Sequence, residues 1–96
     1  MINTDMNQFI DYLNYGEEID ILYKGDKYLI EGYCNEDNNF HLFVYKYENG
    51  GNEADEMIYE IDSNISIKDC ADKFLEAKIW NGKSFWEVEK EMEWID

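Results

Sequence analysis

Carboxylates dominate the residues of this chain that could do chemistry. The 96 residues include 23 Asp and Glu, 8 Lys, one histidine, two cysteines and no arginine. Carboxylate catalysis needs two groups held apart in a defined cleft, and no pair in the sequence is distinguished from the others. The sequence also contains no nucleophile elbow, P-loop, dinucleotide fingerprint or HExxH motif. We therefore predict that the chain is not an enzyme.

The cysteines and the single histidine are predicted to be structural. Cys34 and Cys70 show neither CxxC nor Cys/His spacing, so we expect both to be reduced and buried. His41 lies in an aromatic segment, where a pairing or surface role is expected. The acidic stretches 35–39 and 53–56 lack the pattern of a calcium-binding loop. The sequence predicts no cofactor and no dedicated metal site.

A net charge of −15 is the strongest feature of the sequence. Such a charge repels nucleic acid and anionic lipid and attracts basic proteins. We therefore expect a basic protein as the partner, with no direct binding of nucleic acid or membranes; the alternative is that the acidity only maintains solubility. The chain is expected to be a monomer or a homodimer. The lack of a long apolar run predicts no signal peptide, no transmembrane span and a cytoplasmic location.

Two acidic clusters and one tryptophan are candidates for partner binding. In a predicted strand, Glu56, Glu60 and Asp62 share one parity and hence one face. On a predicted helix, Glu87 and Glu91 are i,i+4 neighbours, a like-charge pair that costs stability. Such rows can imitate a phosphate backbone, and a merely solvated face is the alternative. The candidate residues, including a tryptophan that could anchor an interface, are Glu53, Asp55, Glu56, Glu60, Asp62, Trp86, Glu87 and Glu91.

Hydrophobic periodicity predicts the first elements that must position these residues. A helix is expected from the N-cap Thr4 to a stop at Gly16. A β-hairpin follows, with Gly25-Asp26 as a type II′ turn that places Tyr23 opposite Tyr28.

Capping boxes mark the helices of the second half, Ser66 with Asp69 and Ser84 with Glu87. Residues 91–96 also alternate, so a short closing strand is an alternative to the end of the last helix. The predicted elements of this half are strands over 40–47 and about 57–61, a helix from Ser66 to a stop at Asn81-Gly82, and a helix from Ser84.

The order α-β-β-β-β-α-α predicts an α+β fold in a single domain over residues 1–96. Its antiparallel sheet should have three to four strands, with one N-terminal and two C-terminal helices on one face.

Two segments of the chain carry a resemblance to other proteins. They are Gly16-Glu17-Glu18-Ile19 with Tyr23-Lys24-Gly25-Asp26-Lys27-Tyr28, and Phe74-Leu75 and Ile79 with Gly82-Lys83-Ser84-Phe85-Trp86-Glu87. These segments resemble a loose group of short, acidic, uncharacterised proteins of low-GC Gram-positive bacteria and their phages and mobile elements. The resemblance implies an α+β fold and no particular activity or site. Phage and mobile-element proteins of this size and acidity are often inhibitors of host defence nucleases, an analogy of size and charge.

The leading functional hypothesis is therefore an inhibitor of a nucleic-acid-binding host defence protein, such as a nuclease effector, acting as an anti-CRISPR-like DNA mimic. One alternative is an immunity or antitoxin-type protein that neutralises a basic toxin. The other is a regulatory domain whose acidity serves only solubility.

Overall fold

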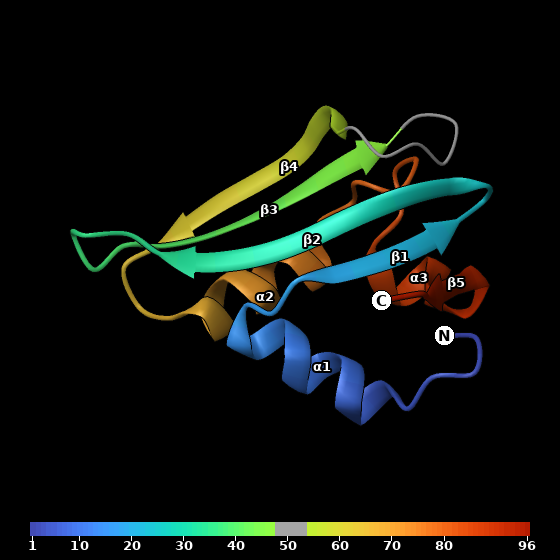
Figure 1. Cartoon of the computed structure of the whole chain (residues 1–96), viewed down its shortest axis with the longest axis horizontal. Helices are drawn as coiled ribbons and strands as arrows, with labels where there is room; N and C mark the ends of the chain where they lie inside the picture. Colours follow the sequence, from blue (N-terminus) through green and yellow to red (C-terminus); the bar gives the residue numbers. More distant parts are fainter. Residues whose placement is uncertain (48–53) are drawn as a thin grey trace.

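The computed structural model describes residues 1–47 and 54–96, and their side chains except those of residues 54 and 55. The N-terminal helix is followed by four strands, a second helix, a short third helix with one 3-10 turn, and a closing strand (Figure 1). The elements are α1 (Met6–Tyr15), β1 (Ile19–Tyr23), β2 (Asp26–Cys34), β3 (Phe40–Tyr47), β4 (Ala54–Ser63), α2 (Ile67–Glu76), α3 (Phe85–Val88), η2 (Glu89–Glu91) and β5 (Met92–Trp94).

The strands form one antiparallel sheet in the order β4-β3-β2-β1-β5. The helices lie together on one side of this sheet (Figure 1). The predicted α+β fold and the placement of the helices are therefore confirmed. The sheet has five strands and not three to four, because β5 adds to the free edge of β1.

The β1–β2 hairpin turns one residue earlier than predicted. Lys24 and Gly25 occupy the turn with φ of 51° and 84°, so it is a type I′ turn and not type II′. Tyr23 consequently pairs with Asp26, and Ile21 pairs with Tyr28. The error shifts the pairing by two residues, so every side chain keeps its predicted face.

Gly25→Val is expected to lower the free energy of unfolding by about 1–2 kcal/mol. A Cβ on Gly25 would meet nothing within 4 Å, so the loss comes from the positive φ and not from a clash. Urea unfolding of this variant tests the prediction. A Lys24→Gly variant is measured for comparison, and it should relieve strain at the neighbouring positive φ. A Gly25→Val chain as stable as the parent would contradict the turn geometry.

The helix ends agree with the sequence signals in most respects. The N-cap of α1 is Asp5 and not Thr4, because the Asp5 carboxylate accepts the Asn7 N–H. Gly16 ends α1 in the left-handed conformation, as predicted. Ser66 caps α2 by accepting the Asp69 N–H, but α2 ends at Glu76, before the predicted stop at residues 81–82, which form a separate turn.

The C-terminal helix is shorter than the hydrophobic periodicity of the sequence predicts. Ser84 and Glu87 form the predicted capping box, yet α3 ends at Val88. The chain then turns through η2 into β5, whose Met92 pairs with Tyr23 of β1. Met92 is fully buried in this strand, whereas Ile95, just beyond its end, is 43% exposed. Covering the edge of β1 therefore prevails over continuing the helix.

The hydrophobic core fills the space between the sheet and the three helices. Its fully buried rings pack from helix to helix. Phe9 stacks on Phe85 at 5.4 Å between centroids, and Phe74 is tilted against Phe85 at 6.0 Å. Cys70 lies in this core, and burial raises the pKa of its thiol. Cys34 is exposed at the end of β2, so the prediction that both cysteines are buried is wrong for this one. In the described part of the chain, no helix is long and apolar enough to cross a membrane.

Candidate protein-binding site

The predicted acidic face of β4 is divided by an irregularity in the strand. Glu60 lies opposite Phe43 and Asp62 opposite His41, whereas Glu56 lies opposite Lys46. The β3–β4 register shifts between Val44 and Tyr45, where a bulge adds one residue to β4. An added residue reverses the parity, so the prediction that Glu56 shares a face with Glu60 and Asp62 is wrong.

The remaining candidates on β4 lie at its start. Glu53 is outside the described residues, and of Asp55 only the backbone is described.

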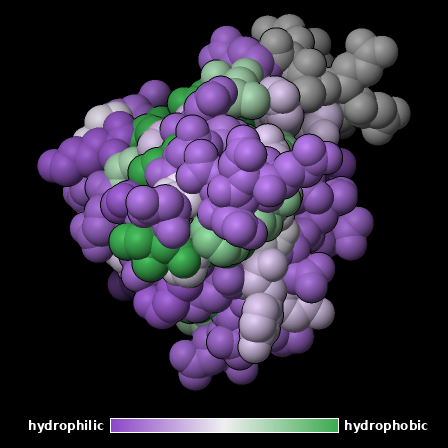
Figure 2. Space-filling model, turned by 90° about the vertical axis from the view of Figure 1, so that its left-hand side faces the viewer, coloured by the Kyte–Doolittle hydropathy of each residue, from purple (hydrophilic) through white to green (hydrophobic). Residues whose placement is uncertain are grey.

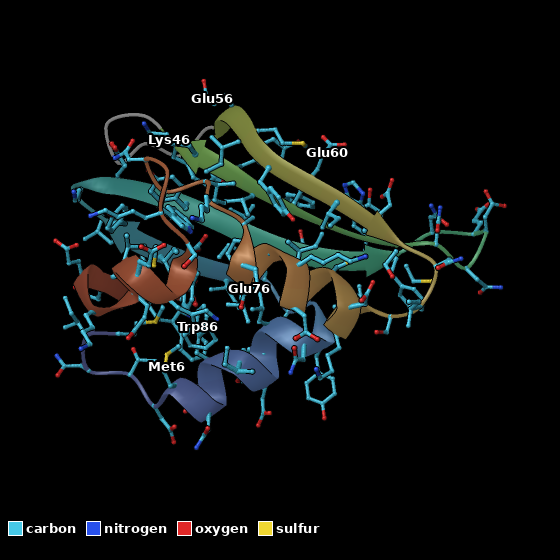
Figure 3. The ribbon with its side chains drawn as sticks, turned by 180° about the vertical axis from the view of Figure 1, so that it is seen from behind. Met6, Lys46, Glu56, Glu60, Glu76 and Trp86 are labelled. Carbon is cyan, nitrogen blue, oxygen red and sulfur yellow. The ribbon has the colours of Figure 1, made fainter. Side chains whose placement is uncertain are left out.

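The C-terminal candidates lie on the helical side of the molecule. Figure 3 shows Trp86 beside α1 and α3, far from Glu60 on β4. Trp86 is 47% exposed, with its ring edge-on to Phe85 at 5.5 Å. The Glu87 carboxylate accepts the Ser84 N–H, which lowers its pKa. Glu91 lies in η2, beyond the end of α3, so the predicted i,i+4 pair on one continuous helix is wrong.

A different surface brings Glu60 and Asp62 together with aromatic side chains. This surface, which we call the outer face, is the side of the sheet away from the helices (Figure 1). Alternate residues of the strands point to it, while their neighbours Tyr28, Ile30, Leu42 and Val44 are buried beneath the helices. Strand register assigns to the outer face Asp20, Leu22, Lys27, Leu29, Glu31, Tyr33, His41, Phe43, Tyr45, Tyr47, Met57, Glu60 and Asp62.

Aromatic rings form a strip along the outer face. Tyr33 lies 5.1 Å from His41 and 6.3 Å from Phe43, and Phe43 lies 5.0 Å from Tyr45. The Lys27 ammonium lies 5.4 Å from the ring of Tyr47 at the other end of the strip. Tyr33 is 49% exposed, and the other rings of the strip are half-buried. The outer face of an antiparallel sheet is usually polar, so this strip is unusual for a solvated surface.

Carboxylates border the strip on both sides. Glu60 and Asp62 follow it on β4, and Glu31 lies across from Phe43 on β2. Partial burial and the nearby Glu18 carboxylate raise the pKa of Glu31. His41 Nδ1 contacts Asp62 Oδ1, and Asp20 lies 3.8 Å from the Lys27 ammonium. Glu31 and Glu60 thus face the strip with no cation beside them among the described residues.

Glu31→Gln is expected to make stability depend less on pH. A carboxyl whose pKa is raised by folding keeps its proton longer in the folded state. Stability therefore falls as the pH rises from the ordinary glutamate value through the raised folded value. The variant should be more stable than the parent at about pH 7, by less than about 1 kcal/mol, and equally stable at about pH 3.

Urea unfolding at both pH values measures this difference, with Glu36→Gln in the exposed β2–β3 turn as the control for net charge. A Glu31→Gln chain with no advantage at the higher pH would contradict the burial of an unneutralised carboxylate.

The described part of the outer face is an open surface and not a cleft. The residues that the structure describes enclose no pocket. Nor, within residues 1–47 and 54–96, do three or more His, Cys, Asp or Glu side chains gather as metal ligands do. Hydrophilic residues also cover most of the end of the molecule where the β2–β3 turn and the start of α2 lie (Figure 2).

The aromatic residues of the outer face and Glu31 were not among the site candidates predicted from the sequence. The available signal was the alternation of rings in β3, where His41, Phe43, Tyr45 and Tyr47 share one parity. Comparison with protein-family models, with curated proteins and with solved structures finds no match for this chain.

Proposed function

We propose that this chain is a non-catalytic acidic protein that occupies the basic, nucleic-acid-binding surface of a partner protein and so inhibits it. The observation that supports this proposal is that most carboxylates of the chain have no positively charged side chain beside them in its described part. The chain has 23 carboxylate residues and 8 lysines, and in its described part only four lysines lie within 4.0 Å of a carboxylate. The acidic groups thus remain available to cations outside the molecule.

A surface that binds a phosphate backbone is a natural target for such a protein. It presents clustered lysine and arginine side chains, which a polyanion attracts over a long range and at a high association rate. Glu60 and Asp62, two positions apart on one face of β4, have Cα atoms about 6.5–7 Å apart and form a short row of negative charge. In the specific form of the proposal, the partner is a nuclease effector of host defence and the chain is a DNA mimic from a phage or mobile element.

Displacement of proteins from DNA tests the proposal. Proteins of a host lysate are bound to DNA-cellulose and eluted with this chain at about 50 mM salt, where electrostatic attraction is weakly screened. The expected result is selective elution of one basic protein, which is lost at about 200 mM salt.

Polyglutamate of equal total charge is the control for acidity alone. If the chain elutes nothing that polyglutamate does not elute, the proposal is wrong.

A second candidate function is supported by the exposed ring of Trp86. Immunity-type proteins bind one toxin through a small hot spot, in which tryptophan is common. For this function, Trp86→Ala should abolish binding of a basic toxin, while charge reversal on the outer face should have little effect. Recovery of a toxin that does not bind DNA would favour this candidate over the first.

A further inference from the structure

The outer face combines two properties that solubility alone does not require. It exposes one ring and two other apolar side chains, with Tyr33, Leu22 and Met57 at least 36% exposed, and leaves the rings of β3 half-buried. It also places carboxylates beside those rings and not at a distance from them. Within the described residues, no other segment lies over this surface (Figure 1).

The spacing of the central row favours a flat cationic group. Strand register orders this row as Glu60 on β4, Phe43 on β3 and Glu31 on β2. Neighbouring strands lie about 4.8 Å apart, so the Cα atoms of the two glutamates are about 10 Å apart with the ring between them. A cation stacked on Phe43 is therefore within reach of a carboxylate on either side.

The negative charge of the chain disfavours three other occupants of the face. A second copy would bring another net charge of −15 against the same carboxylates. Nucleic acid and anionic membranes are repelled for the same reason, since both need basic residues to bind. Charge complementarity leaves a cationic protein segment.

Among cationic side chains, arginine fits this surface better than lysine. The guanidinium group is planar, stacks on aromatic faces and donates two parallel hydrogen bonds to a carboxylate. The lysine ammonium is a compact, strongly hydrated charge. It is not planar, so it cannot stack on a ring while donating two parallel hydrogen bonds to a carboxylate. The adjacent rings Phe43 and Tyr45, 5.0 Å apart, provide stacking positions beside Glu60 and Glu31.

The size of the face limits the part of the partner that contacts it. Four residue rows along β2 and β3, and five strands across, cover about 20 Å by 20 Å, or about 400 Å². This is about half of the area that one partner buries in a standard interface between folded proteins. A single helix or extended segment matches this area better than a whole domain surface does.

We propose that the outer face is a docking surface for an arginine-bearing segment of a basic partner protein, in which guanidinium groups stack on the rings of Tyr33, Phe43 and Tyr45 and pair with Glu31 and Glu60. This inference rests on the proposed function, because it identifies the surface through which the acidic chain engages its partner. It adds a chemical preference for arginine over lysine that depends on the aromatic rings as well as on the carboxylates.

Two short peptides of equal length and charge test the preference. Fluorescently labelled octa-arginine and octa-lysine are titrated with the full chain at about 50 mM salt, and binding is followed by anisotropy. The expected result is that octa-arginine binds about five- to thirtyfold more tightly, the range that one or two stacked guanidinium groups provide. Tyr33→Ala and Phe43→Leu should remove most of this preference.

Tyr15→Ala is the matched control, since Tyr15 is 79% exposed on α1 and not on the sheet. It should leave both affinities unchanged. Phe43→Leu keeps an apolar side chain at the half-buried position, and unfolding curves identify any variant that has lost its fold. A Tyr33→Phe chain should retain the preference because the ring is kept.

Equal affinities for the two peptides, unaffected by the loss of either ring, would overturn the inference. The proposed function would survive that outcome if the chain still displaced a basic protein from DNA, so the two failures are distinguishable. Binding of a labelled single-stranded DNA to the chain would contradict both.

Discussion

Replacing Glu31, Glu60 and Asp62 by lysine is expected to weaken binding of octa-arginine by about 100-fold or more at low salt, while the chain stays folded. The close attractions at Glu31 and Glu60 become repulsions, Asp62→Lys adds a third positive charge beside them, and close charge pairs at a protein interface couple by about 1.5–7 kcal/mol each. The net charge changes only from −15 to −9, since each reversal adds two charges. Exposed charges contribute less than about 1 kcal/mol each to stability, and relief of self-repulsion offsets part of any loss. Anisotropy titrations and urea unfolding measure the two effects.

Reversal of three carboxylates on the helical side is the matched control. Asp11, Glu76 and Glu91 are exposed on α1, α2 and η2, and their reversal also gives a net charge of −9. We expect this variant to lose less than about tenfold in affinity, because only the overall field is reduced. Equal losses in the two variants would show that binding depends on total charge and not on the outer face.

Gly16→Val is expected to lower the free energy of unfolding by about 2–5 kcal/mol, the largest effect on stability that we predict for one surface position. Gly16 ends α1 with a φ of 77°, and its carbonyl accepts the Gly32 N–H of β2 at 3.1 Å. A Cβ at Gly16 would lie 2.8 Å from the Gly32 carbonyl oxygen, so the substitution adds a backbone clash to the conformational strain. Because this contact docks α1 on the sheet, α1 should also separate from β2.

The Gly25→Val variant separates the two causes of that loss. Gly25 has a similar φ of 84° but open space around a Cβ, so its replacement measures the strain alone. Urea unfolding of both variants should therefore show a larger loss at Gly16. Equal losses would mean that α1 is not held against β2 by this close approach.

Local signals in the sequence predicted the fold class and most element positions. The strand at Phe40–Tyr47 and the caps at Gly16, Ser66 and Ser84 agree with the structure because each depends on a few neighbouring residues. The hairpin kept its faces despite the wrong turn, because the error was an even number of residues.

Features that depend on distant contacts were not predictable in this way. The bulge in β4 is defined by its register with β3, and nothing in residues 57–61 alone marks the added residue. Similarly, Met92 and Trp94 fit either a helix or a strand, and the free edge of β1 favours the strand.

The residues of the candidate site also divide into those that local sequence predicts and those that only distant contacts bring together. Sequence position groups Glu56 with Glu60, but the bulge separates them and leaves Glu60 beside Phe43. The pairing of Glu31 with Phe43 joins two strands and requires the β2–β3 register. The alternating rings of β3 were visible in the sequence. That these rings are only half-buried depends on all the helices packing on the other side of the sheet.

The central claim, that this acidic chain binds a protein in place of nucleic acid, is tested most directly with the protein that it elutes from DNA. That protein, the chain and a short DNA duplex are mixed and separated by size-exclusion chromatography with light scattering. The account predicts two binary complexes and no ternary complex, with the affinity of the chain for the protein falling steeply between about 50 and 200 mM salt. A stable ternary complex, or an affinity that does not change with salt, would contradict it.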